Sequence, residues 1–246
     1  MSLTLEVALA LAEDVATLAA LHERELTPPV LRELAAIGFP DNLALLPRNA
    51  AQAEAFALMR TAVLACVDPA TPMDDLAAEF AAIYLTGAYG ASPCESVWLS
   101  DEHLICQEAM FELRDLYTAS GFAVPDWRKR PDDHLVFQLQ FLARRLAALR
   151  DDAGLRALAA FLDEHLLRWL PDFAARLAAR CEQQFYAALA ILTNSWCQQL
   201  RDHLAEQLHE PRPTPEEIVE RLQPRSQRHP FVAPVRFVPG GAAPSW

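Results

Sequence analysis

Glycine is scarce in this sequence, with 7 residues among 246, and runs of alternating β-branched residues are almost absent. The period-two pattern of a half-buried strand is therefore missing over most of the chain. Alanine, leucine, glutamate, arginine and glutamine are abundant instead, and these residues favour helices. We expect an all-α protein, and its 52% hydrophobic and 22% charged composition is that of a soluble globular chain.

Positively charged residues are fewer than negatively charged ones, with 21 Lys and Arg against 33 Asp and Glu. The formal net charge is −12, and Lys129 is the only lysine. Binding to nucleic acid or to an anionic membrane needs a positive field, so these partners are disfavoured. A basic partner, such as a peptide that carries arginines, fits this charge, although solubility alone also explains it.

Cysteine use points to a reducing compartment. The five cysteines are odd in number and contain no CxxC pair, which argues against a disulfide framework. The N-terminal stretch has no basic region, and Glu6, Glu13 and Asp14 interrupt its apolar run, so it predicts neither a signal peptide nor a membrane span. We expect a cytoplasmic protein without stable membrane insertion.

Helical periodicity and capping residues predict one all-helical bundle domain over residues 1–208. The expected helices cover approximately residues 5–26, 28–37, 50–67, 72–86, 101–120, 131–150, 155–170 and 172–208. Asn49 is the expected cap of the third, and Pro171 is expected to end or kink the seventh. Residues 209–246 hold eight of the eighteen prolines and predict an extended or disordered tail with one short helical turn at 216–222.

Catalytic and metal-binding patterns are weak. Cys94 in a loop and His134 at a later helix start could meet as nucleophile and base, but no nucleophile elbow, Gly-rich phosphate loop or oxyanion-type turn accompanies them. His103 and Cys106 share a face of a predicted helix, and a surface histidine beside a core cysteine explains that spacing without a metal. We therefore expect no cofactor and no metal.

The pair Asp133-His134, in the run RPDDHLVFQLQFL, is the most informative feature. Pro131 suits the first turn of a helix, and the carboxylates complement the helix dipole, so plain capping explains much of the run. A histidine at a helix N-terminus should be neutral. Polar groups at the edge of an apolar surface would equally suit a peptide with charged and apolar parts, so capping and recognition both stay open.

Three stretches resemble the TorD/DmsD family of cytoplasmic redox-enzyme maturation chaperones. They are RPDDHLVFQLQFL, EFAAIYLTGAYGASPCESVWLSDE and FLDEHLLRWLPDFAARL. The similarity spans roughly Leu76 to Leu204, and the first 75 residues match only in helical character. The resemblance implies an all-α fold of the TorD/DmsD type and a chaperone rather than an enzyme.

The resemblance also implies a ligand and a site. The ligand is the twin-arginine signal peptide of a molybdoenzyme precursor, such as a DMSO/TMAO reductase-type or formate dehydrogenase subunit, held until its cofactor is inserted before export. The residues that match the family's motifs are Pro131, Asp133, His134, Ser96, Trp98 and Tyr84. Phe137 joins Trp98 and Tyr84 in an expected apolar groove that Asp133 rims.

The sequence leaves one alternative function, an all-helical enzyme in which His134 acts as base and Asp133 as its orienter. The expected oligomeric state is a monomer or a domain-swapped dimer. Arg128, Lys129 and Arg130 form a cationic run next to a site for a basic peptide. We expect their side chains to point away from the groove.

Overall fold

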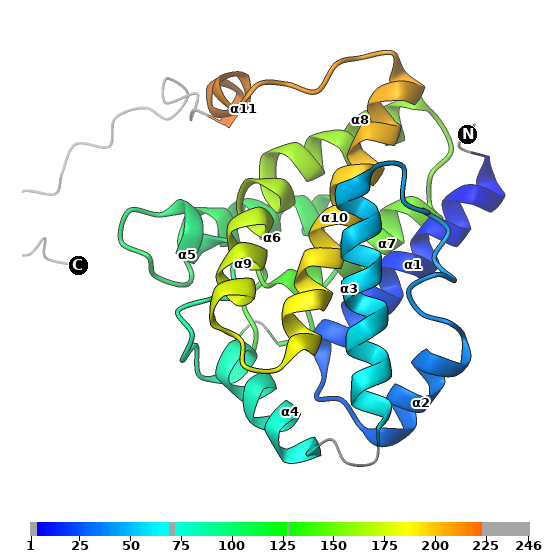
Figure 1. The fold of residues 1–246 in the computed structure, drawn as a ribbon. Coiled ribbons are helices and arrows are strands. Elements are labelled where there is room, and N and C mark those ends of the chain that lie inside the picture. The colour runs from blue at the N-terminus through cyan, green and yellow to red at the C-terminus, as the bar shows by residue number, and fades with distance from the viewer. Residues whose placement is uncertain (1–3, 69–71, 127, 223–246) are drawn as a thin grey trace, which may run out of the picture. The chain divides into compact units, whose positions relative to one another are not determined.

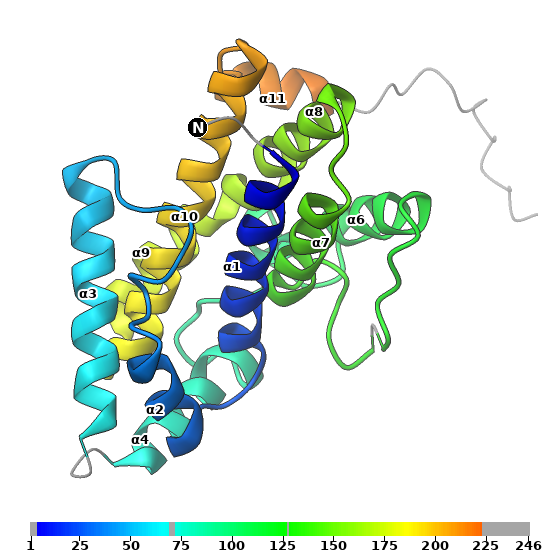
Figure 2. The ribbon, with the colours of Figure 1, turned by 90° about the vertical axis from the view of Figure 1, so that its right-hand side faces the viewer.

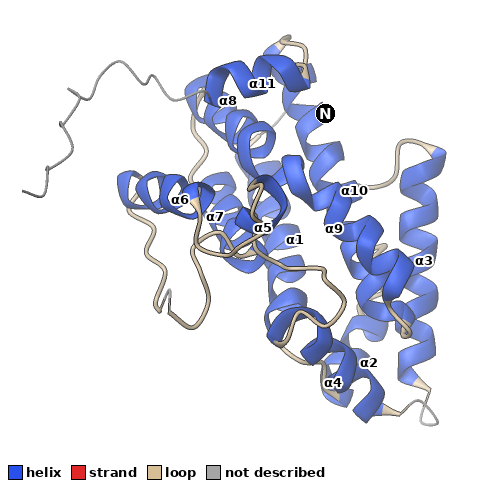
Figure 3. Ribbon diagram, turned by 90° about the vertical axis from the view of Figure 1, so that its left-hand side faces the viewer, coloured by secondary structure: helices blue, strands red, loops and turns tan. Residues whose placement is uncertain are grey.

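The computed structural model describes residues 4–68, 72–126 and 128–222. Every regular element in these ranges is a helix, so the predicted all-α fold is confirmed (Figure 3). The chain divides into two compact units, residues 1–212 and 213–246. In the second unit α11 (Pro215–Leu222) matches the expected short helical turn, and residues 223–246 of the predicted tail lie outside the described residues.

The first unit contains ten α-helices and two π-helical segments among its described residues. They are α1 (Leu5–Glu23), α2 (Pro28–Ala36), α3 (Ala50–Val67), α4 (Met73–Phe80), η1 (Ala81–Leu85), α5 (Ser96–Leu99), α6 (Glu108–Ala119), α7 (Leu135–Ala147), α8 (Asp152–Phe161), η2 (Leu162–Leu166), α9 (Leu167–Arg180) and α10 (Gln184–Leu208).

Two helix pairings organise this unit. The long helix α10 packs against α9, α3 and α8, and Figure 1 shows it between α3 and α9. Helices α1 and α7 pack along each other, side by side in Figure 2. In α1 the side chains of Leu11, Val15 and Leu18 are buried, and α7 is buried on nearly every side of its first turns. Such all-round burial places the start of α7 inside the protein rather than on its surface.

A buried carboxylate ties three distant segments together. Asp14 of α1 accepts the backbone N–H of Ala44 at 2.9–3.0 Å and that of Leu45 at 3.4 Å. It also accepts the indole N–H of Trp196, in α10, at 3.1 Å. Burial raises the pKa of Asp14, and these donors oppose the shift. The loop before α3 is thereby fixed to both α1 and α10.

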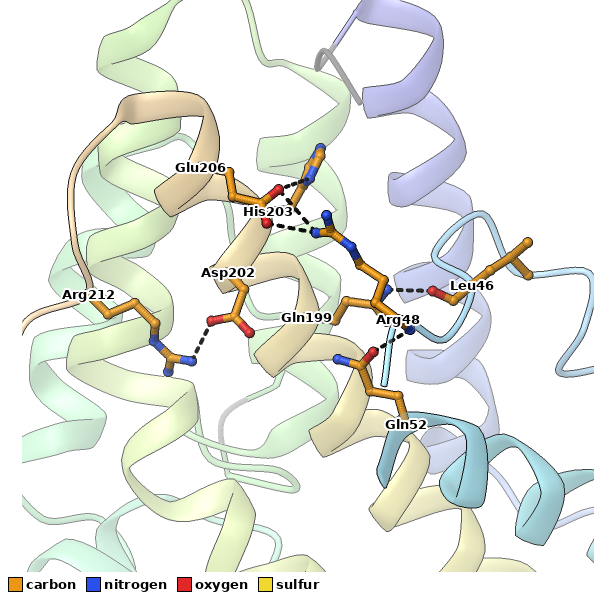
Figure 4. Close-up of polar contacts among 8 residues, drawn as sticks. All are labelled: Leu46, Arg48, Gln52, Gln199, Asp202, His203, Glu206 and Arg212. Carbon is orange, nitrogen blue, oxygen red and sulfur yellow. Dashed lines mark hydrogen bonds and ion pairs between the residues drawn. The ribbon is translucent and has the colours of Figure 1, made fainter. Parts of the chain in front are cut away.

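The same loop contacts the C-terminal half of α10 (Figure 4). Gln199 donates to the carbonyl of Leu46 at 2.6 Å, and the guanidinium of Arg48 contacts both carboxylate oxygens of Glu206 at 3.0 and 3.1 Å. His203 lies beneath with its Nδ1 at 3.6 Å from Glu206. Arg48 and Glu206 are both half-exposed, so this ion pair contributes little to stability.

Several predicted helix limits are wrong. The expected helix over 101–120 starts only at Glu108, because residues 100–107 form a loop. The expected helix over 131–150 starts at Leu135. The expected helix over 172–208 is two helices, and Pro171 lies inside the first of them rather than at its end. The break between them, at Cys181–Gln183, has a tertiary cause: Glu79 accepts the N–H groups of residues 182 and 183 at 2.7 and 2.8 Å.

Helix α3 is long and apolar enough to cross a membrane by length and composition alone. In the structure it packs against α10 and α2, with Phe56, Met59 and Val63 buried. Only 33% of this stretch is buried in the structure, and a single such helix is weak evidence for a membrane span, because helices of soluble proteins can meet the same length and composition test.

Candidate functional site

The run RPDDHLVFQLQFL, which we call the signature run, contains a helix cap. His134 is the N-cap residue of α7, and its ring Nδ1 accepts the backbone N–H of Val136 at 3.1 Å. The imidazole therefore carries its proton on Nε2. Burial lowers the pKa of His134 well below its ordinary value, and the charge of Arg130 acts in the same direction. The prediction that this histidine is neutral is confirmed.

The two most family-like stretches are bonded to each other. The N–H of Leu135 donates to the carbonyl of Pro93 at 2.7 Å, and Cys94 and His134 form an isolated antiparallel bridge. The N–H of Ser96 donates to Oδ2 of Asp133 at 2.8 Å. We call the pairing of residues 93–96 with residues 133–135 the signature junction. Asp133 is 0% exposed and Ser96 1%, so this junction is internal.

A second layer of buried polar groups supports the junction. The carboxylate of Glu95 accepts Nε2–H of Gln138 at 2.9 Å and lies 3.1 Å from Nδ1 of His165, in η2. The same amide of Gln138 donates to the carbonyl of Asp133 at 3.0 Å. Burial raises the pKa of Glu95. Burial alone would lower the pKa of His165, but the hydrogen bond and charge of Glu95 outweigh it and the pKa is raised.

Sequence reasoning missed Glu95 and Gln138 as parts of this cluster. Glu95 stands inside the family-like run SPCESVW, which was the available signal. The sequence contains no signal for Gln138, because only the tertiary contacts show that its amide bridges two segments.

The two aromatic candidates lie in different surroundings. Trp98 is half-buried and donates its indole N–H to the carbonyl of Ser92 at 2.8 Å. The guanidinium of Arg176 lies over the Trp98 ring, 5.2 Å from its centroid. Tyr84, also half-buried, donates its hydroxyl to Nδ1 of His22 at 2.6 Å. It belongs to a second cluster, with Phe80 at a centroid distance of 4.8 Å.

Phe137 is 6% exposed and packs near the ring of His134, with centroids 6.4 Å apart. The guanidinium of Arg130 lies 5.7 Å from the Phe137 ring centroid, and its Nη2 donates to the carbonyl of Glu23 at 3.1 Å. The prediction that this side chain points away from the expected groove is therefore wrong for Arg130. Lys129 does point to solvent, with 86% of its side chain exposed.

The geometry does not support a base–orienter pair. Asp133 is bonded to Ser96 rather than to His134, whose Nδ1 is already engaged by Val136. Cys94 and His134 are paired through their backbones, but burial raises the pKa of the Cys94 thiol, and the charge of Asp133 raises it further. A neutral thiol is a poor nucleophile.

His103 and Cys106 do not lie on one face of a helix, as the sequence predicted. His103 and Cys106 lie in the loop before α6, both with positive φ, at 52° and 60°. Neither is buried, so the expectation of a shared helical face is wrong. Within the described ranges, no three His, Cys, Asp or Glu side chains are placed to hold a metal ion.

Comparison with known sequences identifies the family. A model of the family described as nitrate reductase delta subunit matches residues 48–175, which extends further toward the N-terminus than the resemblance seen from motifs. Among curated relatives, the chaperone protein TorD of Vibrio cholerae (strain O395) is 32% identical over 144 residues, covering 55% of this chain and 65% of that protein. TorD of Shewanella sp. (strain MR-4) is 32% identical over 142 residues, covering 55% and 66%.

This chain thus matches just under two thirds of the length of these relatives. The relatives are TorD chaperones, so the TorD resemblance read from the motifs is confirmed. Because the matched family model covers more than half of the sequence, the chain belongs to the nitrate reductase delta subunit family.

Proposed function

We propose that this protein is a cytoplasmic chaperone that binds the twin-arginine signal peptide of a molybdenum-cofactor oxidoreductase precursor and holds the precursor for cofactor insertion before export. The observation that carries the proposal is the signature junction: the two stretches shared with TorD-like proteins form one bonded unit. Relatives that share this family are named as TorD chaperones.

Charge and apolar surface support the choice of ligand. The net charge of −12 favours encounter with a basic peptide, while the affinity itself depends mainly on desolvated apolar contacts. A twin-arginine leader offers both, since an apolar segment follows its arginines. Binding requires no chemical step, in agreement with the structural use of Asp133 and His134.

The seven predicted site residues divide by exposure. Pro131, Trp98 and Tyr84 are half-buried and accessible in part, so we assign direct peptide contact to them. The buried residues Ser96, Asp133, His134 and Phe137 would act from beneath, by fixing the backbone next to Trp98 and Pro131.

The proposal is tested by isothermal titration calorimetry with synthetic twin-arginine leaders of the molybdoenzymes encoded in the same genome. We expect at least one leader to bind with a Kd of about 1 μM or below. Replacing both arginines of that leader with glutamine should abolish binding. Trp98→Ala should weaken binding by about tenfold, and Trp98→Phe, which keeps an aromatic ring, should weaken it less.

A circular dichroism melt of each variant separates loss of binding from loss of fold. If none of the leaders binds the wild-type protein, the proposed function is wrong. Turnover of a small molecule that His134→Ala abolishes would instead support the enzyme alternative.

A further inference from the structure

The loop between α5 and α6 exposes apolar side chains. Leu104 is 52% exposed, Ile105 55%, and Phe111, in the first turn of α6, 52%. These three residues lie within eight positions of the chain, and we call them the α6 patch. Figure 1 shows the loop at the edge of the molecule beside α5. Clustered exposed apolar residues mark interaction surfaces more often than single ones do.

The loop is held in a defined conformation. Nδ1 of His103 bonds to the carbonyl of Val97 at 2.9 Å, and the N–H of Gln107 donates to the hydroxyl of Ser96 at 3.2 Å. The left-handed residues His103 and Cys106 stand on either side of Leu104 and Ile105. Backbone that non-glycine residues rarely adopt persists only where other contacts impose it, so the apolar pair is presented by an ordered loop.

Negatively charged residues are concentrated in the same stretch of the chain as the patch. Residues 97–126 contain six carboxylates and one arginine. Four of these acids are exposed in the loop and on α6: Asp101, Glu102, Glu108 and Asp115. An apolar surface among carboxylates complements a ligand that is both apolar and basic.

The α6 patch continues to the signature run through Arg114. Its guanidinium lies 5.4 Å from the ring centroid of Phe111 and donates to Oδ2 of Asp132 at 2.8 Å. Arg114 and Asp132 also line a pocket of about 430 Å³ with Tyr117 and Phe122. Asp132 immediately precedes Asp133 of the signature junction, so patch, pocket and junction are neighbours.

We propose that the α6 patch and this pocket bind the apolar segment of the twin-arginine signal peptide, with the peptide's arginines facing the carboxylates of the loop and of α6. This inference rests on the proposed function and adds a binding surface to it. The peptide would lie along α5 and α6, where Ser96 joins the loop to the signature junction: its N–H donates to Asp133, and its hydroxyl accepts the N–H of Gln107.

The test uses the full chain and a fluorescein-labelled leader found to bind it, measured by fluorescence anisotropy. The double variant Ile105→Ser/Phe111→Ala should bind about tenfold more weakly or worse. Both side chains are exposed, so the fold should be kept, as a circular dichroism melt would show. The matched control is Leu64→Ser, on the outer face of α3 and 62% exposed, which should bind as the wild type does.

Charge is tested separately. Glu108→Gln/Asp115→Asn should weaken binding at low ionic strength, and the difference from wild type should shrink in high salt because screening removes it. Hydrogen exchange of the wild-type protein should slow in residues 100–115 when the leader is added, and not in α3.

Each result decides the placement. Unchanged affinity of the patch variant for a leader that binds wild type would overturn the placement and leave the proposed function standing. Failure of every leader to bind wild type would overturn both. Self-association of wild type that the patch variant abolishes, without any effect of the variant on leader affinity, would make the patch an interface between copies and overturn the inference.

Discussion

The backbone N–H of Ser96 donates to Oδ2 of Asp133 at 2.8 Å, and both residues are almost fully buried. The carboxylate at the centre of the signature run thus holds the two family-like stretches together. Its burial raises the pKa of Asp133, an effect that the hydrogen bonds from Ser96 oppose. A variant at this position tests structure before it tests binding.

Asp133→Ala should lower the free energy of unfolding by about 1–3 kcal/mol, because the N–H of Ser96 loses its buried acceptor. Asp133→Asn keeps an acceptor and should cost less. Urea denaturation followed by circular dichroism measures both, with Asp126→Asn as a control in a more exposed loop. If Asp133→Ala loses leader binding at unchanged stability, the carboxylate contacts the peptide rather than Ser96.

Removing one partner of the buried ion pair Asp163–Arg201 should lower the free energy of unfolding much more than removing one partner of an exposed pair. Nε of Arg201 lies 2.8 and 2.9 Å from the two oxygens of Asp163, and both side chains are 4% exposed. Arg201→Met strands a buried carboxylate and should cost about 3–5 kcal/mol, while Asp163→Leu/Arg201→Met should recover most of the loss.

Urea denaturation of these variants would give the free energies. Arg48→Ala, which breaks the half-exposed pair with Glu206, is the control and should cost less than about 1 kcal/mol. Equal losses at the two pairs would contradict the expectation that burial sets the cost.

A fall in pH should lower the free energy of unfolding because of His22. Its Nε2 donates to Thr193 and its Nδ1 accepts from Tyr84, and burial lowers its pKa from 6.5 to about 3. The unfolded chain takes up a proton below pH 6.5 and the folded chain does not. The contribution of this residue to stability is therefore complete above pH 6.5 and is lost progressively as the pH falls toward 3.

Between about pH 7.5 and about pH 5.5 this loss amounts to about 1.4 kcal/mol. Buried carboxyls such as Asp14 and Glu95, whose pKa values are raised, act in the opposite direction. His22→Gln isolates the histidine, because a neutral amide can fill both hydrogen-bonding roles. The difference in unfolding free energy between wild type and variant should change by that amount over the interval, and a constant difference would show that His22 does not titrate as inferred.

Glu79 should stabilise the start of α10 from outside that helix. Its Oε1 accepts two backbone N–H groups, at Glu182 and Gln183, in the manner of an N-cap. Glu79→Ala should destabilise the protein by about 0.5–2 kcal/mol, and Glu79→Gln by less. Thermal melts compare these variants with Glu54→Ala, an exposed glutamate on α3. A loss at Glu79 no larger than at Glu54 would rule out the capping role.

The local helix signals in the sequence were sufficient for much of the fold. Asn49 caps α3 through its side chain, accepting the N–H of Gln52 at 2.9 Å, as predicted. Gly121, with φ 66°, follows the end of α6. Both features depend on residues within one turn of each other, so they can be predicted from residue type and spacing alone.

The sequence by itself determined an all-helical chain, a neutral histidine near a helix start, and the family. Tertiary structure decided where helices stop, because the deciding hydrogen bonds join residues far apart in the chain. Glu79 bonds to the break between α9 and α10, although it lies 103 positions earlier in the chain. Ser96 bonds to the loop that precedes α6, so that this helix starts later than predicted. The tertiary structure also decided that Asp133 and His134 are buried in the protein. Burial depends on the residues that pack over a group, and a local sequence pattern does not show which residues these are.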